Sequence, residues 1–307
     1  MDVFFLILKN IMLPIFIAVG LGIVVQKKMQ LDLRTLSKLN TYFLLPAVCF
    51  TNLYERDLSF QLFIQILGFL LLLTTVLIIL STFISKLFKF ETKLSASYKN
   101  STVLTNAGNF GIPMSELVFK HDPIGIAIAI IISAYQNIVT FTYGMFTSVS
   151  SERVKRKMIK ELLTQPIIYS IGLAVLLKAL PIRIPQPIWE PIQNISDAFL
   201  AIALLTLGAQ LANLSFKGIS KALYISIVSR LILSPAVAFL LLSVLQIKGV
   251  TAEALFIASA YPTSRNSAIL ALEYNNHPEF AAQAVLLTTM VSCITVTLVV
   301  YISSYLF

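Results

Sequence analysis

The sequence predicts an all-α integral membrane protein of ten transmembrane helices, arranged as two inverted five-helix repeats with broken crossover helices 4 and 9. Three observations lead to this prediction: the composition, the length of the apolar runs, and a weak similarity between the two halves. Apolar residues make up 57% of the 307 residues and charged residues only 12%. Soluble domains are about one quarter charged, so this chain cannot build a water-facing surface. The mean hydropathy of +0.86 agrees.

The apolar runs alternate with short polar loops and define the ten spans. Runs such as 62–84 and 124–149 reach the roughly 20 residues that cross about 30 Å of hydrocarbon. Asp2 stands where a signal peptide has a basic region, so we expect the first run to remain as a helix. Spans 2, 4, 7 and 9 are richer in Asn, Ser, Thr, Gly and Pro, and are expected to face protein or water. The approximate bounds are 4–26, 36–54, 61–85, 95–120, 124–149, 163–180, 192–213, 221–246, 252–275 and 279–304.

The positions of Lys and Arg predict the orientation and explain the net charge of +9. The loops after spans 1, 3, 5 and 7 carry 15 of these residues, and the opposite side carries 6. Since cytoplasmic loops are the positively charged ones, both termini are expected outside the cell membrane. The cations are confined to short loops and form no stripe interleaved with aromatic residues, so no nucleic-acid partner is expected.

The two halves resemble each other at a nearly constant spacing. Gly20 corresponds to Gly172 and Pro123 to Pro278, with offsets of 152 and 155 residues. Five spans is an odd number, so the second half must be inverted relative to the first, as in many secondary transporters. The predicted division is 1–150 for the first repeat, 151–162 for a short basic cytoplasmic loop, and 163–307 for the second repeat.

Matching interruptions in helices 4 and 9 predict the functional site. The stretch 105–113 holds two glycines, two asparagines and a proline, and the stretch 260–267 holds a proline among Ser, Thr and Asn. A simple proline kink is the alternative, but two matched breaks favour a site. Unwound backbone is tolerated at membrane depth when it is buried in protein or lines a water-filled cavity. The N–H groups freed near Phe110 and Ser264 would attract anions. The expected helix-break residues are Gly111, Pro113 and Pro262, and the expected substrate-binding residues are Asn106, Gly108, Asn109, Gln136, Pro262, Thr263, Ser264, Arg265, Asn266 and Cys49.

Arg265 carries the strongest chemical signal. An arginine near the bilayer centre costs roughly 2.5–3.5 kcal/mol on insertion scales, so it needs a partner. Its planar guanidinium suits a substrate carboxylate, whereas an internal ion pair with Glu116, Asp197 or Glu273 is the structural alternative. Arg230, in span 8, is expected to snorkel or to pack.

Several short stretches form a recognisable set: Leu45-Pro46, 106–113, 195–198, Leu207-Gly208, Pro262 and 273–278. Together they resemble the auxin efflux carrier family, which includes plant auxin exporters and bacterial permeases for small organic acids. The resemblance covers essentially the whole chain. It implies a fold similar to that of the bile-acid sodium symporters, in which helices 1, 2, 6 and 7 form a scaffold and a homodimer interface. Helices 3–5 and 8–10 would form the moving core, and Asn106 would match the residue that helps to hold the hormone carboxylate in plant members.

The expected function is that of a secondary carrier that moves a small organic anion by alternating access. Arg265 stands where the plant pattern is apolar, which favours a dicarboxylate such as malate or malonate. Export of auxin-like aromatic monocarboxylates and sodium-coupled symport are the alternatives. Asp197 or Glu116 can carry a coupling proton, and the freed carbonyls with Asn109 and Gln136 can hold sodium. No other cofactor and no metal are expected.

Two other classes of function receive little support from the sequence. The histidines His121 and His277 fall at span ends, and neither His-Glu-x-x-His nor Gly-x-Ser-x-Gly occurs, so no enzyme is predicted. No repeated filter sequence points to a channel. Cys49 and Cys293 lie in apolar segments and are expected to be small core residues without a disulfide.

Overall fold

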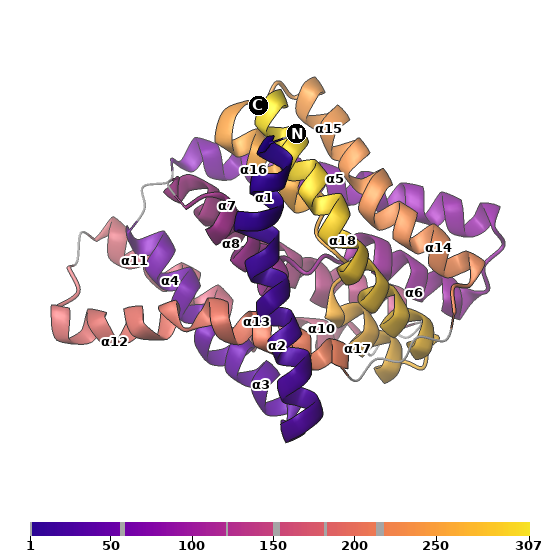
Figure 1. Cartoon of the computed structure of the whole chain (residues 1–307), viewed down its shortest axis with the longest axis horizontal. Coiled ribbons are helices and arrows are strands. Elements are labelled where there is room, and N and C mark those ends of the chain that lie inside the picture. The colour runs from indigo at the N-terminus through magenta and orange to yellow at the C-terminus, as the bar shows by residue number, and fades with distance from the viewer. Residues whose placement is uncertain (1, 56–58, 121, 150–153, 181–182, 213–217) are drawn as a thin grey trace.

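A computed structural model describes the chain except for residues 1, 56–58, 121, 150–153, 181–182 and 213–217, and its regular elements are all helices (Figure 1). Short π-helical turns join some of them, at Leu8–Met12, Asn40–Leu44, Ala107–Gly111, Thr140–Gly144 and Ser229–Leu233. The α-helices are α1 (Asp2–Ile7), α2 (Leu13–Met29), α3 (Leu33–Leu39), α4 (Leu45–Glu55), α5 (Phe60–Leu87), α6 (Thr92–Val103), α7 (Ile112–Val118), α8 (Pro123–Val139), α9 (Met145–Ser148), α10 (Val154–Leu163), α11 (Pro166–Ala179), α12 (Gln186–Asp197), α13 (Phe199–Ala212), α14 (Lys221–Val228), α15 (Ser234–Val244), α16 (Gly249–Ser259), α17 (Arg265–Glu273) and α18 (Pro278–Leu306).

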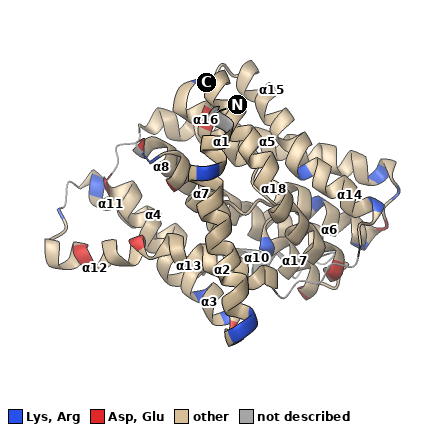
Figure 2. Cartoon of the chain, in the orientation of Figure 1, with Lys and Arg blue, Asp and Glu red and all other residues tan. Residues whose placement is uncertain are grey.

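Six helical stretches among the described residues are long and apolar enough to cross a membrane. This confirms the prediction of an all-α, multi-pass membrane protein. Figure 2 shows the charged residues mostly at the ends of the helices, with long uncharged stretches between them. The six stretches are Phe5–Met29, Phe60–Leu87, Ile124–Ser148, Gln186–Ala212, Lys221–Val244 and Pro278–Leu306.

The other four predicted spans are helical but shorter, more polar or interrupted. Predicted helix 2 corresponds to α3 and α4, joined by a π-helical turn, and predicted helix 6 corresponds to the apolar α11. Predicted helix 4 is divided into α6 and α7, and predicted helix 9 into α16 and α17. The count of ten membrane crossings therefore stays a prediction. The predicted basic loop 151–162 includes α10, and its first three residues lie outside the described part.

The helices form two groups, and the second group includes halves of the interrupted helices. In the first group α2 packs along α13, and α4 packs against α11 and α12. In the second, α5 contacts α6, α8 and α15, while α16 contacts α8, α15 and α18. Both ends of the described chain lie together in Figure 1, where α1 contacts α18.

Two glycines bring the backbones of α2 and α13 close together. A Cβ atom on Gly208 would lie 2.0 Å from the carbonyl oxygen of Val19, and one on Gly22 would lie 2.3 Å from that of Leu205. Only residues without a side chain let two helix backbones come so near, which is common in membrane helix packing. This contact fixes the position of α13 relative to α2.

Candidate functional site

The interruptions of the two broken helices lie side by side and are hydrogen-bonded to each other. Thr105 and Thr263 form an isolated antiparallel bridge. The Asn106 N–H donates to the Pro262 carbonyl at 2.9 Å, and the Ser264 N–H donates to the Leu104 carbonyl at 2.8 Å. Backbone groups that neither helix can satisfy are thus paired with each other, as burial inside a membrane protein requires.

Side chains of neighbouring helices hold this bridge in place. The Thr105 N–H donates to Gln136 Oε1 at 3.3 Å, and the Thr263 N–H donates to Thr288 Oγ1 at 3.1 Å. The Thr263 hydroxyl donates to the Ser101 carbonyl at 2.7 Å. Thr263 is fully buried, so its polar groups serve the fold and are not directed at a ligand.

The helix-4 break lies nearer the N-terminus than its composition suggests. The non-helical segment is 104–106, whereas Gly111 and Pro113 are helical, with Pro113 in the first turn of α7. The predicted helix-break residues therefore lie at and just after the end of the interruption between α6 and α7, because Gly111 is the last residue of the π-helical turn Ala107–Gly111. Proline is compatible with a first helical turn, where its missing N–H has no partner to lose.

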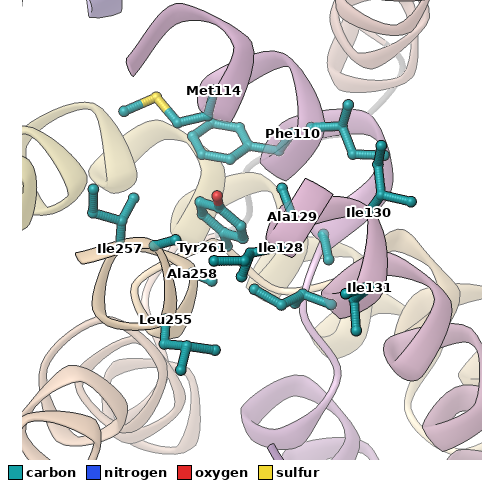
Figure 3. Packing of buried hydrophobic residues seen from close by; sticks show 14 of the residues in the cluster. Phe110, Met114, Ile128, Ala129, Ile130, Ile131, Leu255, Ile257, Ala258 and Tyr261 are labelled. Carbon is teal, nitrogen blue, oxygen red and sulfur yellow. The ribbon is translucent and has the colours of Figure 1, made fainter. Parts of the chain in front are cut away.

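Gly111 also has a packing function. A Cβ atom at this position would lie 2.5 Å from the ring of Tyr261, which fills the space beside the break. The Tyr261 ring also meets Phe110 edge to face at a centroid distance of 5.9 Å, and its hydroxyl lies 2.9 Å from Ser115 Oγ. Figure 3 shows Tyr261 among Phe110 and aliphatic side chains of α8 and α16. The two half-helices are therefore locked together by an aromatic core.

The half-helices that follow the breaks begin at a shared cavity of about 550 Å³. Gly108 and Asn109 from the first of them, and Arg265 and Asn266 from the second, line this cavity. The two N–H groups that were predicted to attract anions are already bonded, that of Phe110 to the Asn106 carbonyl and that of Ser264 to the Leu104 carbonyl, so this prediction was wrong. The first turns of the two half-helices still carry the positive end of the helix dipole, which favours anions. The other lining residues are Leu33, Arg34, Ser37, Lys38, Thr41, Tyr42, Leu45, Thr105, Asn106, Ser133, Gln136, Asn137, Thr140, Phe141, Glu161, Gln165, Ser264, Ile269 and Leu272.

Several amides at the cavity are free to bind a ligand. Within the described part of the chain, the side-chain amides of Asn106, Asn109 and Asn266 make no hydrogen bond to protein. The hydroxyls of Thr105 and Ser133 are buried, and no described residue is their partner. Polar groups at this depth are ordinarily paired, so several unpaired polar groups in residues that line one cavity are typical of a binding site.

Arg265 is the first residue of α17 and lies between two cavities. It lines the one just described and a second one of about 500 Å³ between α13, α17 and α18. One guanidinium nitrogen donates to the hydroxyl of Ser37 on α3. Among the described residues Arg265 forms no ion pair, which argues against the alternative in which Glu116, Asp197 or Glu273 neutralises it.

Residues of α3 form part of the cavity wall, and none of them was among the predicted site residues. Arg34, Ser37, Lys38 and Thr41 lie three or four residues apart and so share one helix face. The spacing of these four polar residues in the sequence could have identified them as one face of a helix at the site. Asp32 caps this helix, and hydrogen bonds from the Thr35 hydroxyl and the Arg34 backbone hold the pKa of its carboxyl below the usual range.

Some predicted site residues lie away from the cavity. Cys49 is fully buried in the hydrophobic core, in agreement with the core role also expected for it. Pro262 and Thr263 belong to the buried bridge between the breaks. Asp197 is exposed at the end of α12, where it accepts from Gln193 Nε2 at 2.8 Å, and Glu116 is half-buried on α7 without lining the cavity.

Arg230 does not snorkel, so that part of its predicted behaviour was wrong. Its side chain is completely buried, and its guanidinium donates to backbone carbonyls beside both breaks. Of the two alternatives predicted for Arg230, packing is the one observed, but its partners on two distant helices could not be predicted from the sequence.

Comparison with known proteins places this architecture in a family. A family model described as "Membrane transport protein" matches residues 7–300. An uncharacterized transporter of Methanocaldococcus jannaschii is 23% identical over 273 residues, which cover 86% of this chain and 88% of that protein. The chain therefore belongs to the membrane transport protein family, which is the auxin efflux carrier family.

Proposed function

We propose that this chain is a secondary carrier that moves a small organic anion, in particular a dicarboxylate such as malate or malonate, through the cavity between the two breaks. The supporting observation is the charge and polarity of the cavity wall. Arg34, Lys38 and Arg265 line it together with uncommitted amides, and Glu161 is its only acidic lining residue among those described. Two carboxylates need more positive charge than one, and guanidinium groups bind carboxylates in a bidentate manner.

The size of the cavity fits this class of substrate. A volume of about 550 Å³ lies within the range of small-molecule sites and exceeds the volume of a four-carbon acid. The extra space can hold water around the charged groups. Aromatic monocarboxylates of the auxin type would leave two of the three cations without a partner, so we rank them second.

We further propose that the cavity opens to the cytoplasm. It is bordered by Arg34 and Lys38, which follow the first span, and by Glu161 and Gln165 near α10. Both regions lie on the side that the distribution of Lys and Arg assigns to the cytoplasm. This arrangement corresponds to an inward-open state of a carrier in the cytoplasmic membrane, with both termini outside.

Alternating access is the proposed mechanism. The group of α1–α4 and α11–α13 would act as the scaffold of a homodimer, and the remaining helices would move as the transport core. The Arg265 contact with Ser37 joins these two groups at the cavity and would have to break when the core moves. The two halves would correspond to the two inverted repeats.

Transport by the purified protein tests the function directly. Proteoliposomes should take up labelled malate or malonate faster than protein-free liposomes, and an excess of unlabelled dicarboxylate should compete more strongly than indole-3-acetate. Preferential competition by indole-3-acetate would support the auxin-like alternative. Absence of uptake for every acid in a mono- and dicarboxylate panel would contradict the proposal.

Asn106→Ala should weaken dicarboxylate binding about tenfold, because one hydrogen bond to a charged group is worth about 1.5 kcal/mol or more. The hydrogen bond to the Pro262 carbonyl is donated by the backbone N–H of Asn106, so the variant keeps this bond and should melt near the wild-type temperature. Isothermal titration and a melting curve in detergent measure the two effects. Asn52→Ala is the control, since Asn52 bonds to its own helix outside the cavity. Unchanged affinity together with a lower melting temperature would make Asn106 a structural residue.

The proposed orientation predicts opposite accessibility for two loop positions. In a cysteine-free background, Lys155→Cys should react with a membrane-impermeant maleimide only after the cells are opened, because it lies on the cytoplasmic side. Arg183→Cys should react in intact cells. Labelling of both positions from the same side would exclude the ten-span topology.

A further inference from the structure

Arg230 joins the two broken helices at the ends that precede their breaks. Its Nη1 donates to the Thr102 carbonyl at 2.8 Å, and its Nη2 donates to the Ser259 carbonyl. Nη2 also lies 2.9 Å from the hydroxyl of Ser234, which itself donates to the Ser259 carbonyl at 2.8 Å. The side chain is fully buried, and among the described residues it forms no ion pair.

The two carbonyls have a particular place in the fold. Thr102 lies in the last turn of α6, and Ser259 is the last residue of α16. A helix C-terminus leaves its last carbonyls unsatisfied and carries the negative end of the dipole, which favours a cation. Two such ends converge on one guanidinium, so the compensation of its charge comes from helix ends and not from a carboxylate.

In many secondary transporters a coupling sodium ion occupies this kind of position, between half-helix C-termini and unwound carbonyls. We propose that Arg230 is a resident cation that takes the place of such an ion, holds the two breaks together, and makes transport independent of sodium. This proposal rests on the proposed carrier function. Arg230 is a positioning residue, since it acts on the cavity through the breaks.

The space around Arg230 agrees with this assignment. The neighbouring cavity has a volume of about 20 Å³, which is close to that of one water molecule. Thr105 and Gln136 line both this small cavity and the large one, so the guanidinium lies one layer behind the substrate site. A metal ion would have to displace the guanidinium to reach the same carbonyls.

The first experiment needs no variant. Uptake of the transported dicarboxylate by wild-type proteoliposomes should be the same in sodium, potassium and choline media at equal ionic strength and without a membrane potential. Uptake that requires sodium would overturn the proposal. Absence of uptake in all three media would instead count against the proposed carrier function.

The second experiment replaces the resident cation. Arg230→Ala should reduce uptake at least about tenfold and lower the melting temperature, because the converging carbonyls lose their donor. Millimolar guanidinium, which fits the vacated space, should restore both quantities in part and should leave the wild type unchanged. Arg230→Lys should keep the charge and retain more activity than the alanine variant.

Leu231→Ala is the matched control. Leu231 is a buried neighbour in the same π-helical turn, so its truncation also creates a cavity but removes no charge. Its melting temperature should fall, and guanidinium should not restore it. The measurements of melting temperature need no substrate, so they test the inference about Arg230 separately from the proposed transport function. Wild-type stability of Arg230→Ala, or equal rescue of both variants, would show that Arg230 is not a resident cation.

Discussion

Replacing Arg265 by alanine is expected to lower the affinity for dicarboxylates by roughly ten- to a hundredfold, which corresponds to the loss of a charged hydrogen bond of about 1.5–3 kcal/mol. Affinity for monocarboxylates should fall less, because Arg34 and Lys38 remain in the cavity to hold one carboxylate. Arg265→Lys should recover only part of the loss, since an ammonium group cannot form the bidentate pair. Titration of each purified variant with malate, malonate and a monocarboxylate measures these effects.

The melting temperature of Arg265→Ala should stay near that of the wild type. The bond that the variant loses leads to the Ser37 hydroxyl, and no buried carboxylate among the described residues is left without its partner. Ser37→Ala removes that bond but keeps the charge, so it should have a smaller effect on affinity. Arg183→Ala, in a loop outside the cavity, is the control for loss of an arginine. Equal losses for both classes of acid, with a large drop in melting temperature, would assign Arg265 to the fold.

Gly208→Ala is expected to have the largest effect on stability. Its new Cβ atom would lie 2.0 Å from the Val19 carbonyl oxygen and 3.0 Å from Gly22 Cα, and both belong to the backbone of a packed helix. Neither can move without separating α2 from α13. Overpacking costs about 1–3 kcal/mol even where side chains can adjust. A loss of this size corresponds to a drop in melting temperature of about 2–12 °C.

Two other glycines provide the control. A Cβ atom on Gly20 or Gly172 would meet nothing within 4 Å, and both glycines are in helices, where alanine has the higher propensity. Gly20→Ala and Gly172→Ala should therefore melt at or slightly above the wild-type temperature in detergent. If Gly208→Ala were as stable as these two variants, α2 and α13 would not be in backbone contact.

Composition and the length of the apolar runs predicted that the chain lies in a membrane and that its fold is all-α. A chain with few charges and long apolar runs must lie in a membrane, and helices satisfy their own backbone there, so composition and run length were sufficient. The sequence also located both interruptions to within a few residues, since proline, glycine and asparagine act on the backbone at their own positions. Asn106 and Arg265 were recognised for the same reason: polar groups inside apolar segments are visible without any knowledge of contacts.

The roles of these polar groups depend on contacts between helices that are distant in the sequence. In the sequence, Thr263 and Asn106 are both polar residues at a helix interruption. The polar groups of Thr263 are buried by hydrogen bonds to Thr288 and Ser101, whereas Asn106 lines the cavity. The contact of Gly111 with Tyr261 spans 150 residues of sequence, so no local pattern could predict it. Arg230 likewise depends on Thr102 and Ser259, which lie 128 and 29 residues away. The physical reason is that local backbone preference depends on neighbours in sequence, whereas hydrogen-bond partners and steric limits depend on segments that meet only after the helices have packed.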